Sequence, residues 1–405
     1  MSTAWLLSLI YLAFISLGLP DGVLGVAWPA MRLGLGQPLE AAGLITIVVT
    51  GCSALSGFAS GWVLQRASAG VVVTASGWLT GLALLGFAFS PSFVWLLAAA
   101  IPLGFGAGAV DAAMNHFVAR HYSSRHMNWL HGCWGVGATL GPVIMGAALA
   151  YAGGAGPVTG PGADWRLGYQ LIAGLQLSLA AAFLFTLGWW TRVPAAAPKP
   201  AGNSTHAGPA DNAGVKIVAP IALWLAPGLY FLYAAVEVGT SLWAATVLIE
   251  QRQLSPGTAG VWVSCFFGAI MAGRFATGVV SAHWGNRRLV WAGLLVALVG
   301  TVLVSWGGLV ATFPSGLVLA GLVLMGLGCA PVYPSLMHEA AQRFDAATAQ
   351  RVIGRQVGSA YVGCMVVPAA LGLVGAHLGI GLIMPLIAVF VVALLAGSAW
   401  LDRLT

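Results

Sequence analysis

One apolar segment, Leu103–Arg120, reads LGFGAGAVDAAMNHFVAR and carries a carboxylate, that of Asp111. On a helix, Gly104 and Gly108 lie on the same face as this Asp, because the spacings are i, i+4 and i+7, and Asn115 follows one turn later. A charged Asp at the centre of a membrane helix costs about 2.5 to 3.5 kcal/mol, so such residues usually face a bundle interior or an aqueous path. The segment therefore predicts a membrane helix with a functional polar face.

Composition extends the membrane assignment to the whole chain. Only 6% of the 405 residues are charged and 59% are hydrophobic, and the mean hydropathy is +0.92. A membrane helix needs about 20 residues, which leaves room for about twelve spans in an all-α membrane protein. The first run lacks a basic leader segment, so we expect it to remain as the first helix. The expected spans cover residues 4–31, 41–64, 70–90, 93–119, 127–151, 168–191, 219–249, 257–280, 288–308, 314–337, 352–376 and 380–401.

The basic residues predict the orientation of the chain. The formal net charge is +6, but Lys and Arg are dispersed between apolar segments, so we expect no nucleic-acid partner. With the N-terminus inside, Arg32, Arg166 and Arg252 fall outside, and the other thirteen of the sixteen Lys and Arg residues fall on the cytoplasmic side. This bias predicts that both termini are cytoplasmic, in a plasma membrane such as the bacterial inner membrane.

A stretch rich in Pro, Ala and polar residues divides the chain into two halves. Residues 192–218 predict a cytoplasmic linker between an N-terminal bundle, residues 1–191, and a C-terminal bundle, residues 219–405. The fifth and eleventh segments match at a constant offset of 226 residues. The matched pairs are Arg125/Arg351, Gly132/Gly358, Gly137/Gly363, Pro142/Pro368, Gly146/Gly372 and Gly153/Gly379. Duplicated halves of this kind predict a substrate site near the midplane between them.

Three motifs resemble those of the major facilitator superfamily, and the resemblance covers the whole chain. The loop after the second span holds Gly61 to Arg66, similar to a Gly-x-x-x-Asp-Arg signature with Gln65 in place of the Asp. Residues 278–288 are its counterpart in the second half. The fifth span holds a glycine-proline motif, residues 137–146, of a kind often taken as an antiporter mark. The resemblance implies twelve helices in two pseudo-symmetric six-helix bundles that transport solutes.

Within that superfamily the chain is most similar to the fucose-proton symporter group and the related sodium-dependent glucose transporters. The shared features are Asp21 in the first span, Asp111 with Asn115 in the fourth and Glu237 in the seventh. Gly273-Arg274 in the eighth span and residues 331–334, Pro-Val-Tyr-Pro, in the tenth complete the resemblance. The fifth span departs from the group, because His131 and Trp134 stand where fucose symporters carry amides.

Three acids lie within predicted spans and are the candidates for ion coupling: Asp21, Asp111 and Glu237. Loss of water favours the neutral form of a carboxylate, so an acid inside the membrane can take up and release a proton as the surrounding space opens to each side. We expect Asp111 to carry the proton, and the alternative is a structural hydrogen bond across helices. Sodium is the alternative coupling ion; no other cofactor and no metal site is expected.

A sugar presents hydroxyls and apolar ring faces, so its site needs polar side chains beside aromatic rings. The polar candidates are Asn115, Asn128, His131 and Gln356. The aromatic candidates are Trp28, Trp134, Tyr230, Tyr233, Trp243, Tyr333 and Tyr361. Ordinary packing is the competing interpretation for each ring, because Trp and Tyr are also common at membrane interfaces.

Basic side chains near the helix ends, and one within the eighth span, are candidates for ties that gate the transporter. We assign this role to Arg66, Arg125, Arg274 and Arg351. The sequence lacks a Walker-type phosphate loop, a His-Glu-x-x-His pair and a nucleophile elbow, so we expect neither an ATP-driven pump nor an enzyme. The five cysteines have no metal-ligand spacing.

The sequence thus predicts a secondary transporter that takes up a sugar or a related polar molecule with a cation, most simply a proton. Two alternatives stay open at this point. A proton-coupled exporter of hydrophobic compounds would suit the glycine-proline motif and the aromatic content, whereas a non-transporting receptor or scaffold would need no intramembrane acids. We expect the chain to act as a monomer within the lipid bilayer.

Overall fold

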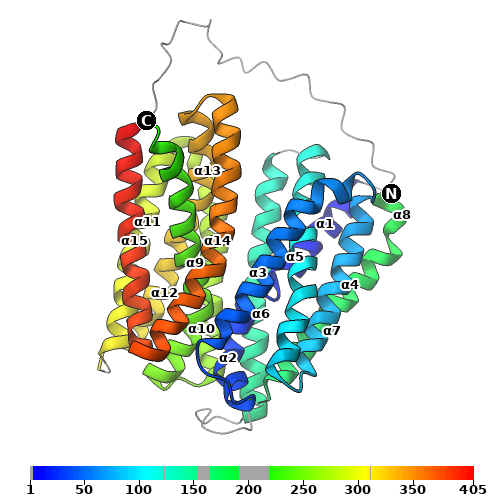
Figure 1. The fold of residues 1–405 in the computed structure, drawn as a ribbon, viewed down its shortest axis with the longest axis vertical. Helices are drawn as coiled ribbons and strands as arrows, with labels where there is room; N and C mark the ends of the chain where they lie inside the picture. Colours follow the sequence, from blue (N-terminus) through cyan, green and yellow to red (C-terminus); the bar gives the residue numbers. More distant parts are fainter. Residues whose placement is uncertain (1–2, 122–123, 154–163, 191–218, 311) are drawn as a thin grey trace, which may run out of the picture.

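The computed structural model describes residues 3–121, 124–153, 164–190, 219–310 and 312–405. Within these residues, 12 helical segments are long and apolar enough to cross a membrane, as the sequence predicts. The segments form two bundles, which we call the N-half (α1–α8) and the C-half (α9–α15), side by side in Figure 1. The predicted linker, residues 192–218, lies outside the described residues.

The helix bounds agree with most of the predicted spans. The N-half contains α1 (Thr3–Gly18), α2 (Val23–Gly34), α3 (Ala41–Leu64), α4 (Ala69–Ala88), α5 (Phe93–His121), α6 (Ser124–Gly153), α7 (Trp165–Phe185) and α8 (Leu187–Trp190). The C-half contains α9 (Ala222–Arg252), α10 (Pro256–Trp284), α11 (Asn286–Leu309), α12 (Ser315–Cys329), α13 (Val332–Arg343), α14 (Ala346–Leu378), a short 3-10 helix (Ile380–Leu382) and α15 (Ile383–Leu404). We call the end where α8 stops and α9 starts the linker end, at the top of Figure 1, and the opposite end the far end.

Two spans that the sequence predicts as continuous are broken near their middles. The first span is interrupted between α1 and α2, where Pro20 lacks the N–H that a helix interior requires. Gly22 follows with φ of 71°, and a Cβ there would lie 2.5 Å from the Phe267 ring. The tenth span is interrupted between α12 and α13, at Ala330 and Pro331. Breaks of this kind survive at membrane depth where the freed backbone is buried in protein or lines a cavity.

Equivalent glycines pack the first helix of each half against the fifth. Gly137 of α6 meets the carbonyl of Ile15 in α1, so closely that a Cβ would overlap it. Its repeat partner, Gly363 of α14, meets the carbonyl of Phe231 in α9, where a Cβ would lie 2.6 Å away. The shared contact is the structural counterpart of the sequence repeat, because small residues let two helix backbones approach closely.

The halves touch through α2, α3 and α6 of one and α9, α10 and α14 of the other. Gly146 of α6 packs on Gly260 of α10, where a Cβ on Gly146 would lie 3.2 Å from the Gly260 Cα. Gly43 at the far end of α3 packs on Ala369 of α14 in the same way. The glycine-proline motif of the fifth span therefore serves close helix packing, both within the N-half and between the halves.

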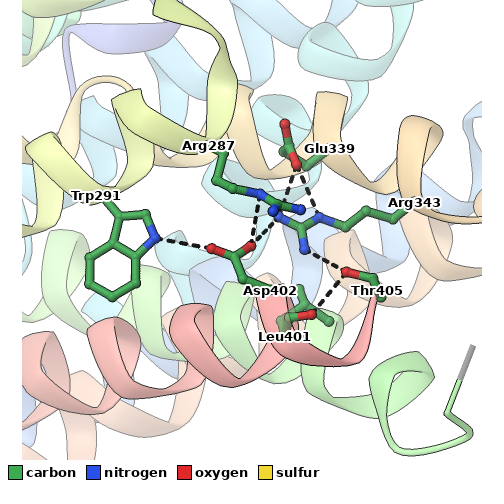
Figure 2. A network of polar contacts seen from close by, with 7 residues as sticks. All are labelled: Arg287, Trp291, Glu339, Arg343, Leu401, Asp402 and Thr405. Carbon is green, nitrogen blue, oxygen red and sulfur yellow. Dashed lines mark hydrogen bonds and ion pairs between the residues drawn. The ribbon is translucent and has the colours of Figure 1, made fainter.

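A network of polar contacts ties three helices of the C-half together at the linker end, and Figure 2 shows it. Asp402 of α15 pairs with Arg343 of α13 and Arg287 of α11, and it accepts a hydrogen bond from Trp291 Nε1 at 3.0 Å. Arg343 also pairs with Glu339 at 2.9 Å. The network anchors α13, the segment beyond the break, to the rest of the C-half.

Candidate functional site

The break in the first span positions an acid against the fifth span. Asp21 lies in the turn between α1 and α2, and its Oδ2 accepts a hydrogen bond of 2.7 Å from Trp134 Nε1 of α6. Gly18, three residues earlier, packs so closely on the Trp134 carbonyl that a Cβ would overlap it. The carboxylate and the indole are therefore held by backbone packing between α1 and α6.

The same indole faces a cation from the other half. The Arg274 guanidinium of α10 lies 4.9 Å from the centroid of the Trp134 ring. Arg274 Nη2 is 3.7 Å from Glu237 Oε1 of α9, and the two side chains are 18% and 13% exposed. Asp21, Trp134, Arg274 and Glu237 thus form a continuous chain of contacts, which we call the seam cluster. It joins the halves through the contact between Trp134 and Arg274.

Three tyrosines pack beside the C-half part of the seam cluster. The ring centroids of Tyr230 and Tyr233 lie 4.9 and 5.8 Å from that of Tyr333. Tyr230 is buried and its hydroxyl donates to the Tyr333 carbonyl at 2.7 Å, just beyond the break in the tenth span. Tyr333 itself is only half-buried. Tyr333 is thus the accessible ring of this group, and the other two hold it in place.

The polar face of α5 approaches the seam cluster from the N-half. Asn115 Nδ2 donates a 3.0 Å hydrogen bond to Asp111 Oδ1, as the i, i+4 spacing allows. Gly108, on the same face, packs on the Ser53 carbonyl of α3. Asp111 is close enough to interact electrostatically with Asp21, and also with Tyr333 across the seam. The glycine part of the predicted face packs against a neighbour, and the Asp–Asn part faces the other half.

The three intramembrane acids therefore lie together. Asp21 interacts electrostatically with both Glu237 and Asp111, although the three come from the first, seventh and fourth spans. Lipid-facing positions would have separated them. Convergence of this kind between two bundles provides charged groups whose neighbours change when the bundles move.

His131 of α6 adds an exposed polar ring near the same region. Its ring meets Phe14 edge-on with the centroids 5.6 Å apart, and it lies within electrostatic range of Arg274. Two other predicted residues of this helix cannot be placed, because the side chains of Arg125 and Asn128 lie outside the described part of the chain.

Comparisons with known proteins identify the family. A family model of the Major Facilitator Superfamily matches residues 10–255 and 228–404. The chain belongs to the major facilitator superfamily. Superfamily members are membrane transporters and in general not enzymes. The chain is therefore an integral membrane protein with a transporter fold.

A curated relative and several solved structures resemble this superfamily member. The uncharacterized transporter y4wD of Sinorhizobium fredii (strain NBRC 101917 / NGR234) is 27% identical over 267 residues, which are 65% of this chain and 62% of the relative. The match thus spans less than two thirds of the relative's length.

The similar solved structures share the fold at low sequence identity. A bacterial homolog to the human lysosomal transporter Spinster, inward-facing and occupied, has a TM-score of 0.77 at 14% identity, over 99% of this chain and 97% of that one. The nucleoside transporter NupG has a TM-score of 0.72 at 13% identity, over 98% and 99%. A D-xylose-proton symporter has a TM-score of 0.71 at 13% identity, over 99% and 97%.

Three predicted binding residues lie in the packed interior of the superfamily fold. Trp28 and Trp243 are fully buried, and their Nε1 atoms donate to the carbonyls of Leu39 and Pro368 at 2.8 Å. Gln356 is also buried, beside a cavity of about 10 Å³ that Glu339 and Arg343 help to line. The two tryptophans pack at the far end and Gln356 packs inside the C-half. None of the three belongs to the seam cluster. Tyr361 is half-buried and lies within electrostatic range of Asp111.

Three of the four arginines assigned to gating have described side chains, and these occupy different surroundings. Arg274 lies within α10, the eighth span, and belongs to the seam cluster. Arg66 follows the end of α3, is exposed and stacks on Trp62 of that helix, 4.0 Å from the ring centroid. Arg351 is exposed and contacts Thr348, also on its own helix. Arg274 thus bridges the halves.

Sequence reasoning missed an ion pair that joins the halves at the far end. Arg32 Nη2 at the end of α2 lies 2.6 Å from Glu250 Oε1 at the end of α9, and the side chains are 24% and 30% exposed. In the sequence, Arg32 counted only toward the orientation of the chain, and Glu250 had no assigned role. The first and seventh spans are equivalent in a duplicated chain, and these two residues carry opposite charges at the far ends of those spans. That pattern could have predicted the ion pair.

Reversing one charge of this pair should open the far end. In Arg32→Glu, attraction becomes repulsion with Glu250, and a partly exposed pair contributes about 1 kcal/mol, enough to change a two-state population several-fold. Spin labels at positions 35 and 254, in a background without native cysteines, would report the distance across the far end by electron-electron resonance.

The charge-swapped double variant Arg32→Glu/Glu250→Arg is the matched control. We expect it to recover the short distance of the parent, because the pair is restored with its signs exchanged. A distance distribution that is identical in all three proteins would mean that the pair does not influence the closure of this end.

Proposed function

We propose that this transporter couples proton entry to the uptake of a sugar or a related polar small molecule by alternating access. The seam cluster is the observation that carries the proposal. Its halves meet through the contact between Trp134 and Arg274, beside a ring contact between Trp134 and Phe267. A rocking motion that separates the halves would part these groups and change the charge environment of Asp21 and Glu237.

Asp111 is the proposed proton carrier, with Asp21 and Glu237 as its partners. A carboxylate in a poorly hydrated environment favours its protonated form, and it releases the proton when water or a cation approaches. Asp111 is half-buried, is hydrogen-bonded by Asn115 and lies within electrostatic range of Asp21. A proton that reaches it can therefore influence the seam cluster directly.

Two features support a sugar or polyol as the solute. Half-buried Tyr333 and Tyr361 lie near Asp111, and Asn115 and exposed His131 supply hydrogen-bonding groups, the combination that a hydroxylated ring requires. The resemblance to the fucose-proton symporter and sodium-dependent glucose transporter branch points to the same class. One of the similar folds is that of a D-xylose-proton symporter.

The proposed location is a plasma membrane, the inner membrane in a bacterium, with the linker end and both termini in the cytoplasm. The distribution of Lys and Arg supports this orientation. An exporter of hydrophobic compounds receives no separate support, because the glycine-proline motif of α6 packs on α1 and α10.

Gradient-driven uptake into proteoliposomes tests the proposal. A thermal-shift screen of monosaccharides on the purified protein first selects a solute, since a ligand that binds the native state raises the melting temperature. We expect an inward proton gradient to drive accumulation of that solute above its external concentration, and a protonophore to abolish it. If accumulation requires a sodium gradient and does not depend on the proton gradient, sodium is the coupling ion. If the solute only equilibrates under either gradient, coupled transport is refuted.

A further inference from the structure

Arg274 has hydrogen-bonding capacity that the described protein does not use. A guanidinium offers five N–H donors. Tyr233 is a side-chain hydrogen-bond partner of Arg274, whereas Glu237 Oε1 lies 3.7 Å from Nη2, which is beyond hydrogen-bond length. These two groups leave most of the five donors to other partners. The Arg274 Cζ lies over the face of the Trp134 ring, 4.9 Å from the ring centroid. The side chain is 18% exposed, so its free donors are accessible from the seam.

The other partly buried arginines of the C-half are satisfied. Arg252 donates to three backbone carbonyls and one hydroxyl, those of Gly307, Val310, Phe313 and Ser315. Arg343 binds two carboxylates and one hydroxyl, those of Glu339, Asp402 and Thr405. These two guanidinium groups, which hold helices of the C-half together, are thus each bonded to several acceptors, and Arg274 differs from them.

The surroundings of Arg274 fix the direction in which it can bind. The Trp134 ring lies against the guanidinium, and the hydrogen bond from its Nε1 to Asp21 fixes the indole. A planar guanidinium held in this way matches a carboxylate in bidentate geometry, which a neutral hydroxyl cannot provide. Tyr333 lies within electrostatic range of both Arg274 and Asp111, and Asn115 is hydrogen-bonded to Asp111. These polar groups suit the hydroxylated remainder of a ligand.

We propose that the transported solute is a polyhydroxylated carboxylic acid, whose carboxylate docks on Arg274. This inference rests on the proposed function and narrows its substrate from sugars in general to sugar acids. Glu237 competes with the solute, because both are anions that interact with one guanidinium. A carboxylate on Arg274 adds one negative charge to a neutral pair, and one proton taken up by the seam restores the balance, so the acid and a proton would cross together.

Binding of matched acids and neutral polyols to the purified full-length protein tests the inference. The acids are D-gluconate, D-galactonate and D-glucuronate, and the neutral partners are D-glucitol, D-galactitol and D-glucose. We expect at least one acid to raise the melting temperature and to bind at least about tenfold more tightly than its neutral partner by calorimetry, because the bidentate contact is lost.

Variants of the ion pair separate ligand binding from a purely structural role. Arg274→Gln should weaken binding of the acid by at least about 30-fold, whereas Glu237→Gln should tighten it several-fold by removing the competitor. Arg274→Lys keeps the charge without the planar fork and should still lose about tenfold, which covers the case that the Gln variant fails to fold. Arg288→Lys, on an exposed residue of α11, is the matched control and should bind like the parent.

The inference is overturned if no acid of the panel binds, if a neutral partner binds as well as its acid, or if acid affinity is the same in Arg274→Gln. Proton-driven accumulation of a neutral sugar that survives Arg274→Lys would overturn it while the proposed function stands. If the protein binds the acid but shows no gradient-driven transport, the carboxylate site on Arg274 stands and the proposed function is refuted.

Discussion

Proteoliposomes that contain Asp111→Asn should exchange labelled solute across the membrane but fail to accumulate it under an inward proton gradient. The amide keeps the size of the side chain and can still hydrogen-bond Asn115, whose amide contacts Asp111 at 3.0 Å in the parent. It cannot bind and release a proton in the physiological range. Alternating access then continues, and the link to the proton gradient is lost, which predicts a fall from full accumulation to none.

The measurement is the ratio of internal to external solute with and without the gradient, beside counterflow at equal pH. Glu40→Gln is a matched control, because it makes the same chemical change in the turn before α3, outside the seam cluster. It should accumulate solute like the parent. Full accumulation by Asp111→Asn would mean that another group carries the proton, and Asp21 and Glu237 would be the next to substitute.

Gly137→Leu should prevent recovery of folded protein. A Cβ at this position would overlap the Ile15 carbonyl and approach the backbone of Gly18 and the Leu19 nitrogen. Backbone cannot rotate away as a side chain can, so α1 and α6 must move apart. Overpacking typically costs about 1 to 3 kcal/mol and occasionally more, and we expect the upper end here. The separation would also break the contact between Trp134 and Asp21.

Gly174→Leu in α7 provides the control, because a Cβ there meets nothing within 4 Å. Both variants add the same side chain to a helix of the N-half. We expect Gly174→Leu to elute as a single sharp peak in size-exclusion chromatography with a melting temperature close to that of the parent, and Gly137→Leu to aggregate. Equal behaviour of the two variants would show that α1 and α6 do not need their close approach.

Helix positions could be predicted well from the sequence, and the breaks could not. The span at residues 41–64 matches α3 residue for residue, because a long apolar run bounded by polar turns is a local property. Pro20 indicated a kink, but not the left-handed Gly22 that contacts Phe267 from the other half. The break depends on a packing partner about 245 residues away, and hydropathy along the chain carries no information about it.

The candidate site was predicted in part. The acids at positions 21, 111 and 237 stood out because a carboxylate is rare inside an apolar run. Ring type alone could not separate Tyr333, which is accessible, from Trp243, which is buried against Pro368. The same holds for Gln356, which the structure places inside the C-half. An aromatic or amide side chain packs in a core and lines a cavity equally well, and the choice depends on neighbours from distant helices.

Length, hydropathy and the internal repeat were enough to establish a duplicated twelve-span membrane protein, because each is a pattern of neighbouring or regularly offset residues. The meeting of Trp134 with Arg274 was not accessible in this way. Those two side chains are 140 positions apart and belong to different halves, so their contact exists only after both bundles have folded and packed. The packing between α6 and α10 turned a predicted gating arginine into the centre of the seam cluster.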